Sequence, residues 1–259
     1  RDKYLLPMGA AIWSAGLTAM PDFPLRFFLQ FCNNHGLLNI NDRPQWAVIK
    51  GGSREYVKAM LAKCGSDGIR LNSPVAKVRR FDESVEIALA DGSTEHFDQV
   101  VFACHSDQAL KMLADATPAE QQVLGGIAYQ DNDVVLHTDI RLLPKRKAAW
   151  AAWNYLLGAD AATRATLSYN MNMLQGINSD TTFVVSLNAS DRIAPEQVLR
   201  RFTYAHPVYK NSTMRSQARR GEINGQNRSY YCGAYWYNGF HEDGVRSAVD
   251  VAAMLGVQF

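Results

Sequence analysis

The feature that most constrains the fold is a run near the C-terminal end, which reads YYCGAYWYNGFHEDGVRSA over residues 230–248. A short apolar segment leads into Gly233, an aromatic loop follows to Gly239, and a helical pattern extends from about Asp243 to Leu255. This order predicts a strand, a turn and a helix. A glycine at the strand end lets a ligand approach the backbone, and the N–H groups at a helix start can hold an anion or an electron-rich ring edge. The glycines alone favour a plain strand-to-helix turn.

The remainder of the sequence predicts an α/β fold (α+β in part). Asp91-Gly92 between two alternating stretches is typical of a β-hairpin turn, and the run from Thr117 to Glu120 has the spacing of a capping box that begins a helix. Further helices are expected at residues 24–36, 54–63, 106–112 and 195–202. Strands are expected at residues 69–71, 76–81, 85–89, 100–103, 133–138, 149–155, 165–171 and 182–187. Residues 203–229 predict a loop-rich stretch.

Charge and composition exclude several classes of protein. The chain has 27 Lys and Arg against 25 Asp and Glu, which argues against a strongly basic nucleic-acid binder. The basic, aromatic stretch 200–220 is best interpreted as a solvated loop. No apolar run approaches the roughly 20 residues that span a bilayer, so no transmembrane segment is expected. The four cysteines contain no C-x-x-C, so we expect no metal site, reduced thiols and a cytoplasmic location.

Three stretches, in this order along the chain, resemble the flavin-containing amine oxidase and phytoene desaturase superfamily. Residues 46–52 (WAVIKGG) are similar to its Gly-Gly turn after the substrate-domain helices. Residues 71–75 and 91–105 are similar to its flavin-domain β-meander, and residues 233–244 resemble its C-terminal flavin-binding segment. With the order of strands and helices, the resemblance covers nearly the whole chain, and it is nearest to bacterial NAD/FAD-binding amine-oxidase-like proteins.

The resemblance implies a non-covalent FAD site. Val75 would contact the adenine through its backbone, and Gly233 would let the chain pass close to the ribityl–pyrophosphate. Phe240 would face the flavin ring, and the main-chain N–H of His241 would reach the pyrimidine edge of that ring. The full set of implied cofactor-binding residues is Val75, Gly233, Ala234, Gly239, Phe240, His241 and Gly244.

The resemblance also implies a substrate wall on the sheet of the substrate domain. The residues concerned are His137, Trp153, Asn154 and Tyr155, with Asn154 and Tyr155 as polar contacts. Core packing with satisfied polar tips is the simpler interpretation for any one of them. No catalytic residue is singled out. Cys104 and His105 are adjacent on a strand and point to opposite faces, which argues against a nucleophile–base pair.

The sequence departs from the family in four ways. It contains no G-x-G-x-x-G, which the family places more than a hundred residues earlier, so we expect the C-terminal portion of a longer flavoprotein. Tyr235 replaces the acid that often follows the first glycine of the turn. The region of the covalent flavin cysteine holds no cysteine. The strand over residues 131–137 lacks the lysine of true amine oxidases, which argues against amine oxidation.

These observations predict a discontinuous two-domain chain. Residues 1–68 and 106–225 would form a mixed-sheet substrate domain with helices, and residues 69–105 and 226–259 would be the C-terminal pieces of an FAD/NAD(P)-binding domain. The expected function is that of an FAD-dependent oxidoreductase, or its C-terminal portion, which transfers a hydride to flavin from a C–H bond of an apolar, lipid-like substrate. The alternative is a non-catalytic module that binds a lipid or a protein partner. Exposed apolar surface would favour self-association.

Overall fold

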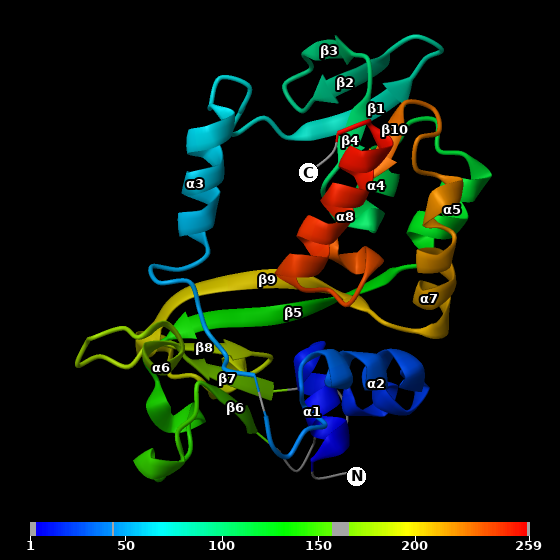
Figure 1. The fold of residues 1–259 in the computed structure, drawn as a ribbon. Helices are drawn as coiled ribbons and strands as arrows, with labels where there is room; N and C mark the ends of the chain where they lie inside the picture. Colours follow the sequence, from blue (N-terminus) through cyan, green and yellow to red (C-terminus); the bar gives the residue numbers. More distant parts are fainter. Residues whose placement is uncertain (1–3, 43, 157–165, 258–259) are drawn as a thin grey trace. The chain divides into compact units, whose positions relative to one another are not determined.

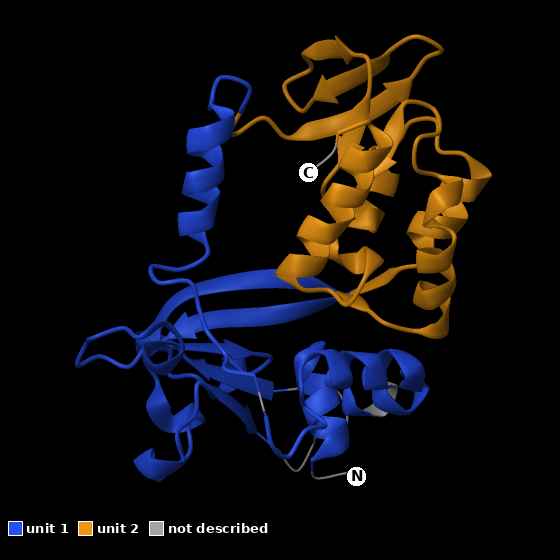
Figure 2. Cartoon of the chain, in the orientation of Figure 1, with its two compact units in different colours: residues 1–69, 130–206 blue, residues 70–129, 207–259 orange. Residues whose placement is uncertain are grey.

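The protein forms two compact units, each assembled from two separate stretches of chain. Unit 1 comprises residues 1–69 and 130–206, and unit 2 comprises residues 70–129 and 207–259 (Figure 2). The functional division into substrate and flavin domains stays a prediction. The structure, a computed structural model, describes the chain except residues 1–3, 43, 157–165 and 258–259.

The N-terminal part of unit 1 is helical and packs around Trp13. The Trp13 ring lies 4.6 Å from the Phe23 ring and 4.7 Å from the Phe31 ring. The helix predicted at residues 24–36 is confirmed, and it buries four residues between its ends: Phe27, Phe28, Phe31 and Cys32. The helices here are α1 (Leu5–Ile12), η1 (Leu17–Asp22), α2 (Leu25–Asn34) and α3 (Arg54–Cys64).

Unit 1 also contains a five-stranded sheet within the described residues, in the order β6-β7-β8-β5-β9 (Figure 1). The pairs β6–β7, β7–β8 and β8–β5 are antiparallel. Its strands are β5 (Ala128–His137), β6 (Trp153–Leu156), β7 (Thr166–Asn170), β8 (Val184–Leu187) and β9 (Val198–Val208). The short helices around it are η2 (Ile140–Leu142), η3 (Lys147–Ala149), α6 (Met171–Gln175), η4 (Ser190–Arg192) and η5 (Pro195–Gln197).

Two of the sequence-based predictions were wrong between residues 195 and 229. Residues 195–202, which were expected to form a helix, form a short turn and then the start of β9. The Thr138 N–H, directly after β5, donates to the Gln197 carbonyl at 3.0 Å, so this part of the chain is bonded to the sheet. Tertiary pairing overrides the local helical pattern here. The stretch expected to be loop-rich contains the rest of β9 and the helix α7 (Asn211–Ala218).

Smaller differences concern strand bounds. Residues 69–71 form no strand, and the strand expected at 149–155 begins at Trp153. Ala165, the first residue of the strand expected at 165–171, lies outside the described residues.

Unit 2 contains an antiparallel sheet and a parallel strand pair, with helices packed around them. The predicted hairpin turn is confirmed, since Gly92 has φ +88° and the Ser93 N–H donates to Asp91 Oδ1 at 2.9 Å. The antiparallel strands are β1 (Val75–Arg80), β2 (Val85–Leu89) and β3 (Thr94–Phe97), and the parallel pair is β4 (Val100–Phe102) with β10 (Ser229–Tyr231). The helices are α4 (Ser106–Met112), α5 (Pro118–Gly125), α7, η6 (Arg220–Glu222), η7 (Ala234–Trp236) and α8 (His241–Met254). The mixture of sheets and helices confirms the predicted fold class.

A buried ion pair joins three elements of unit 2. The guanidinium of Arg80, on β1, contacts both carboxylate oxygens of Glu120, on α5. The Tyr231 hydroxyl, on β10, donates to Glu120 Oε1 at 2.7 Å. Thr117 closes the predicted capping box, because its N–H donates to Glu120 Oε2 at 2.8 Å. Arg80 Nε also donates to Asp115 Oδ2 at 3.1 Å. The pair therefore fixes β1, α5 and β10 against one another.

Replacing Glu120 with Gln should lower the free energy of unfolding by about 3 kcal/mol, because the buried Arg80 guanidinium loses its charged partner. Urea denaturation followed by circular dichroism measures the change. Glu222→Gln is the matched control, since Glu222 pairs with Arg219 at the surface, where water screens the pair and its loss should cost far less than loss of the buried pair. Equal losses in the two variants would contradict a dominant role for the buried pair.

The same pair should make the fold sensitive to acid. Burial alone would raise the pKa of Glu120, but hydrogen bonds from Arg80 and Tyr231 outweigh burial and lower this pKa to about 2. A carboxyl group whose pKa is lower in the folded state stabilises the fold at pH values above its ordinary pKa of 4.5. This stabilisation is lost as the pH falls from 4.5 toward 2. We expect the stability difference between wild type and Glu120→Gln to shrink over this range in urea titrations.

Candidate functional site

Two parallel strands of unit 2 end at the same edge. β4 and β10 pair so that Phe102 lies beside Tyr231, and the Cys232 N–H donates to the Phe102 carbonyl at 3.0 Å. His105, which follows β4, and Gly233, which follows β10, therefore lie at one carboxyl edge. In α/β proteins, ligands bind in the crevice outside this edge. The candidate site is assembled here.

Both glycines of the C-terminal turn are required by their surroundings. A Cβ added at Gly233 would collide with the Tyr235 ring, and one added at Gly239 would lie 2.6 Å from the Tyr209 hydroxyl. Gly239 also has φ +96°, a conformation that L side chains rarely adopt. The Gly233 N–H donates to Ser247 Oγ at 2.8 Å. The backbone at the two glycines is therefore held by side chains packed against it, Tyr235 at Gly233 and Tyr209 at Gly239.

The start of α8 lies directly after this turn and brings the positive end of the helix to the site. The Phe240 N–H donates to Asp243 Oδ2 at 2.9 Å, and Glu242 lies beside Asp243 in the first turn. These two carboxylates already offset the positive end of the helix. The N–H groups of the first turn therefore suit a partly negative ring edge better than a full anion.

Three tyrosine side chains, buried or half-buried, pack in and around the turn. Burial raises the pKa of Tyr129 to about 12. Burial also raises the pKa values of Tyr209 and Tyr235, and the Tyr129 phenol raises both of these pKa values further. Tyr235 is 3% exposed, and its hydroxyl has no hydrogen-bond partner among the described residues. The residue that replaces the family's acid therefore packs in the core, where it fills the space beside Gly233.

All residues predicted to bind the cofactor belong to unit 2. Val75 starts β1 opposite Leu89 and is partly exposed. A Cβ added at Gly244 would have Ala234 N, at 3.9 Å, as its nearest neighbour, so the backbone at the start of α8 is open to close approach. A glycine-bounded turn at the carboxyl edge of a parallel strand pair, followed by a helix start, is the kind of site that holds a dinucleotide. The individual contacts of Val75, Gly233, Ala234, Gly239, Phe240, His241 and Gly244 stay predictions.

The residues predicted to contact the substrate belong to unit 1 and divide between the two faces of its sheet. Trp153 and Tyr155 pack on the face that also carries Val134 and Leu167. Asn154 lies on the opposite face, where its Nδ2 donates to the Ser168 carbonyl at 3.2 Å and to the Ala151 carbonyl at 2.7 Å. The structure thus brings Trp153 and Tyr155 together and separates them from Asn154.

His137 lies on the same face as Asn154 and is fully buried in a polar ladder. Its Nε2 lies 2.8 Å from Ser186 Oγ, which in turn lies 2.6 Å from Ser168 Oγ. Its Nδ1 accepts the Asp139 N–H at 3.0 Å, so the ring proton is on Nε2 and is donated to Ser186. A histidine in this tautomer cannot take the serine proton, so the contact is structural. The substrate role of His137 stays a prediction.

Sequence reasoning missed Tyr209. The Tyr209 side chain is buried against Gly239, a residue that lies thirty positions further along the sequence. It follows β9 and precedes α7, in the stretch that the sequence pattern presents as a loop. No short-range signal could have connected these two residues, because they are thirty positions apart and meet only in the folded chain.

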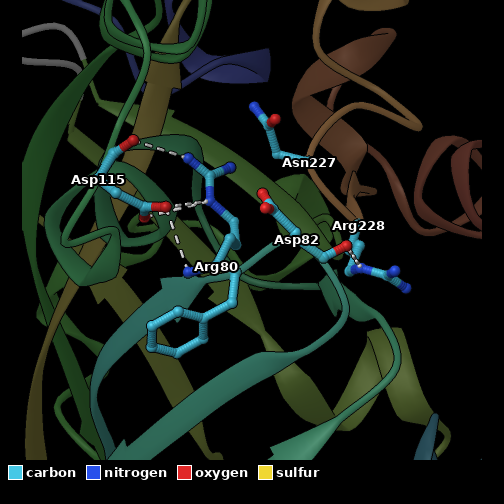
Figure 3. Close-up of a pocket in the computed structure, with 6 residues that line it drawn as sticks. Arg80, Asp82, Asp115, Asn227 and Arg228 are labelled. Carbon is cyan, nitrogen blue, oxygen red and sulfur yellow. Dashed lines mark hydrogen bonds and ion pairs between the residues drawn. The ribbon is translucent and has the colours of Figure 1, made fainter.

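A separate pocket of about 380 Å³ lies at the opposite edge of the parallel pair (Figure 3). Its lining residues are Arg80, Phe81, Asp82, Asp115, Asn227 and Arg228. Asn227 and Arg228 both have positive φ, and Arg228 is anchored by donating to the carbonyls of Asp82 and Asp98. The charges of its two arginines and two aspartates balance.

Two further searches cover only the part of the chain that the structure describes. No three His, Cys, Asp or Glu side chains come together there as a metal site would require. No helix there is long and apolar enough to cross a membrane.

Comparison with known proteins defines the class of the chain. A family model described as flavin containing amine oxidoreductase matches residues 8–170. The chain belongs to this family, which confirms the resemblance inferred from the sequence. A search of curated proteins finds no match to the chain.

Solved structures share the fold. A fatty acid isomerase from P. acnes aligns with a TM-score of 0.68 and 14% identity, over 97% of this chain and 63% of that one. Cyclohexylamine oxidase from Brevibacterium oxydans IH-35A aligns with a TM-score of 0.61 and 12% identity, over 97% and 64% of the two chains. The protein therefore spans less than two thirds of the length of these relatives.

Gly239→Ala should destabilise the protein by about 2 kcal/mol or more, because the new methyl group meets Tyr209 and the backbone is held at positive φ. Gly92→Ala is the matched control, since Gly92 has a similar φ of +88° but open space around it. Thermal unfolding of both variants isolates the cost of the Tyr209 contact. Equal destabilisation would show that the contact contributes nothing.

His137 should make unit 1 sensitive to mild acid. Burial lowers the pKa of His137 below its ordinary value of 6.5, even though Asp139 opposes this shift. Below that pH the unfolded chain binds a proton that the folded chain rejects, so stability falls by up to about 1.4 kcal/mol per pH unit. Urea titrations between pH 7 and 5 should show a smaller slope in His137→Gln. The same substitution at exposed His96 should leave the slope unchanged.

Proposed function

We propose that the chain is the C-terminal portion of an FAD-dependent oxidoreductase that oxidises a C–H bond of an apolar substrate, with a lipid as the leading candidate. The observation that carries the proposal is the glycine-bounded turn at residues 233–239, which lies at the carboxyl edge of β4 and β10 and leads into α8, in a chain whose family is flavin-containing. FAD supplies a two-electron acceptor for a hydride.

The residues of unit 2 provide the means to hold FAD without a covalent bond. The turn backbone would pass beside the ribityl–pyrophosphate, and the His241 N–H would face the pyrimidine edge of the ring. Val75 would meet the adenine. Burial raises the pKa of Cys104 and of Cys232, and such thiols are weak nucleophiles at neutral pH. This supports non-covalent binding.

Unit 1 supports an apolar substrate. Trp153 and Tyr155 share one sheet face with aliphatic residues. The stretch of β5 over residues 131–137 carries no lysine, which disfavours amine oxidation. The likeness to a fatty acid isomerase agrees with a lipid substrate.

Other expectations remain part of the proposal. All four cysteines are unpaired thiols, as a cytoplasmic location requires. Self-association is supported by large apolar side chains that are exposed on residues 46–71, among them Trp46, Met60 and Leu71.

The proposal is tested by the visible absorbance of the purified chain before and after FAD is added. We expect flavin bands that co-elute with the protein in gel filtration. Anaerobic addition of an unsaturated fatty acid should then bleach the 450 nm region, whereas small amines should not. A chain that gains no bands would contradict the proposal and favour a non-catalytic binding module. Bleaching by amines alone would contradict the lipid assignment.

A further inference from the structure

His105 occupies the carboxyl edge of the parallel pair but has no assigned role. The pairing of β4 with β10 ends at Phe102 and Tyr231, so His105 lies three residues beyond β4 and Gly233 lies two residues beyond β10. It caps the start of α4, where its N–H donates to Gln108 Oε1 at 3.3 Å. Burial raises the pKa of the neighbouring Cys104 thiol, which disfavours a nucleophile–base pair with His105, so a different use of the ring must be considered.

The His105 ring is held in a fixed orientation. It stacks on the Tyr129 ring with centroids 4.5 Å apart and planes 20° apart. Tyr129 is itself fixed, because its hydroxyl accepts the Ser106 N–H at 3.0 Å and lies 3.2 Å from Ser106 Oγ. Tyr129 also packs against the hydrophobic cluster that contains Tyr235, a residue of the Gly233–Gly239 turn. The imidazole is therefore preorganised beside the turn.

The two ring nitrogens of His105 differ. Nδ1 is buried and has no hydrogen-bond partner among the described residues. A buried N–H without an acceptor is rarer than a buried acceptor without a donor, so the ring proton is assigned to Nε2. The Nε2–H then has no hydrogen-bond acceptor in the described part of the fold, and Nε2 is the ring nitrogen that a ligand can reach.

We infer that His105 is a further cofactor-binding residue, whose Nε2–H donates a hydrogen bond to an oxygen of FAD at the carboxyl edge of β4 and β10. This inference rests on the proposed function. The acceptor oxygen belongs either to the ADP half, as a phosphate, or to the riboflavin half, as a ribityl hydroxyl. In both cases the recognition is a fixed donor facing an oxygen acceptor.

The test measures the dissociation constant of FAD by flavin fluorescence for a set of variants. His105→Phe keeps an aromatic ring for stacking on Tyr129 but removes the donor, and should weaken binding about tenfold. His105→Gln keeps a donor at similar reach and should stay within about threefold of wild type. His96→Phe, at an exposed position of the same unit, is the matched control and should change nothing.

A second variant guards against misfolding. His105→Asn is a favoured helix N-cap, so α4 should form, but its amide is too short to replace Nε2. It should therefore weaken FAD binding as His105→Phe does. Binding of ADP and of riboflavin, measured separately, shows which half of FAD loses affinity.

The outcomes separate the two proposals. Wild-type affinity in both His105→Phe and His105→Asn would overturn the role of His105 and leave the FAD site intact. A wild-type chain that binds no FAD would overturn the proposed function and this inference together. Loss of affinity in His105→Gln equal to that in His105→Phe would show that a hydrogen-bond donor at this position does not sustain FAD binding, and would also overturn the inference.

Discussion

The buried contact between Arg80 and Glu120 is the constraint on which unit 2 depends. A carboxylate that is 1% exposed is tolerated only because a guanidinium, a phenol and a main-chain N–H all donate to it. The partners come from β1, the start of α5 and β10, which are distant in sequence. Tyr231 is the last residue of β10, so the contact also fixes where the backbone leaves the strand and enters the Gly233 turn. The buried ion pair between Arg80 and Glu120 therefore positions the candidate site without being part of it.

Local signals in the sequence predicted the parts of the fold that local chemistry determines. Asp91-Gly92 formed the hairpin turn and Thr117 capped its helix, since both depend on neighbouring residues alone. The prediction failed at residues 195–208, where pairing within the sheet outweighed a helical pattern. The same limit applies to the site. The glycines of the turn could be identified from the sequence, whereas Tyr209 beneath one of them could not, because that contact is non-local.

The two compact units divide the candidate residues by chemistry. Unit 2 carries the glycine-bounded turn and the helix end that are typical of a dinucleotide site, and unit 1 carries an aromatic sheet face. Alternation along β6 separates Asn154 from its neighbours Trp153 and Tyr155. A polar residue between two aromatic ones was therefore a sign of a buried hydrogen-bond partner on the other face. The alternation of residues 153–155 in the sequence is enough to predict this division of faces.

The polar ladder of His137, Ser186, Ser168 and Asn154 has a consequence for how this chain can change over evolutionary time. Its members lie on four adjacent strands. Side-chain hydrogen bonds join His137 to Ser186 and Ser186 to Ser168, whereas Asn154 donates to the Ser168 carbonyl. Loss of one of the three residues joined through side chains leaves its neighbour buried without that partner, whereas joint replacement by apolar residues of similar volume need not cost stability. Among homologues, positions 137, 168 and 186 should therefore vary together or not at all. A homologue in which only one of these residues has changed should be rare. The residues of the ladder would then distinguish groups of related sequences, and would not indicate whether a homologue is catalytically active.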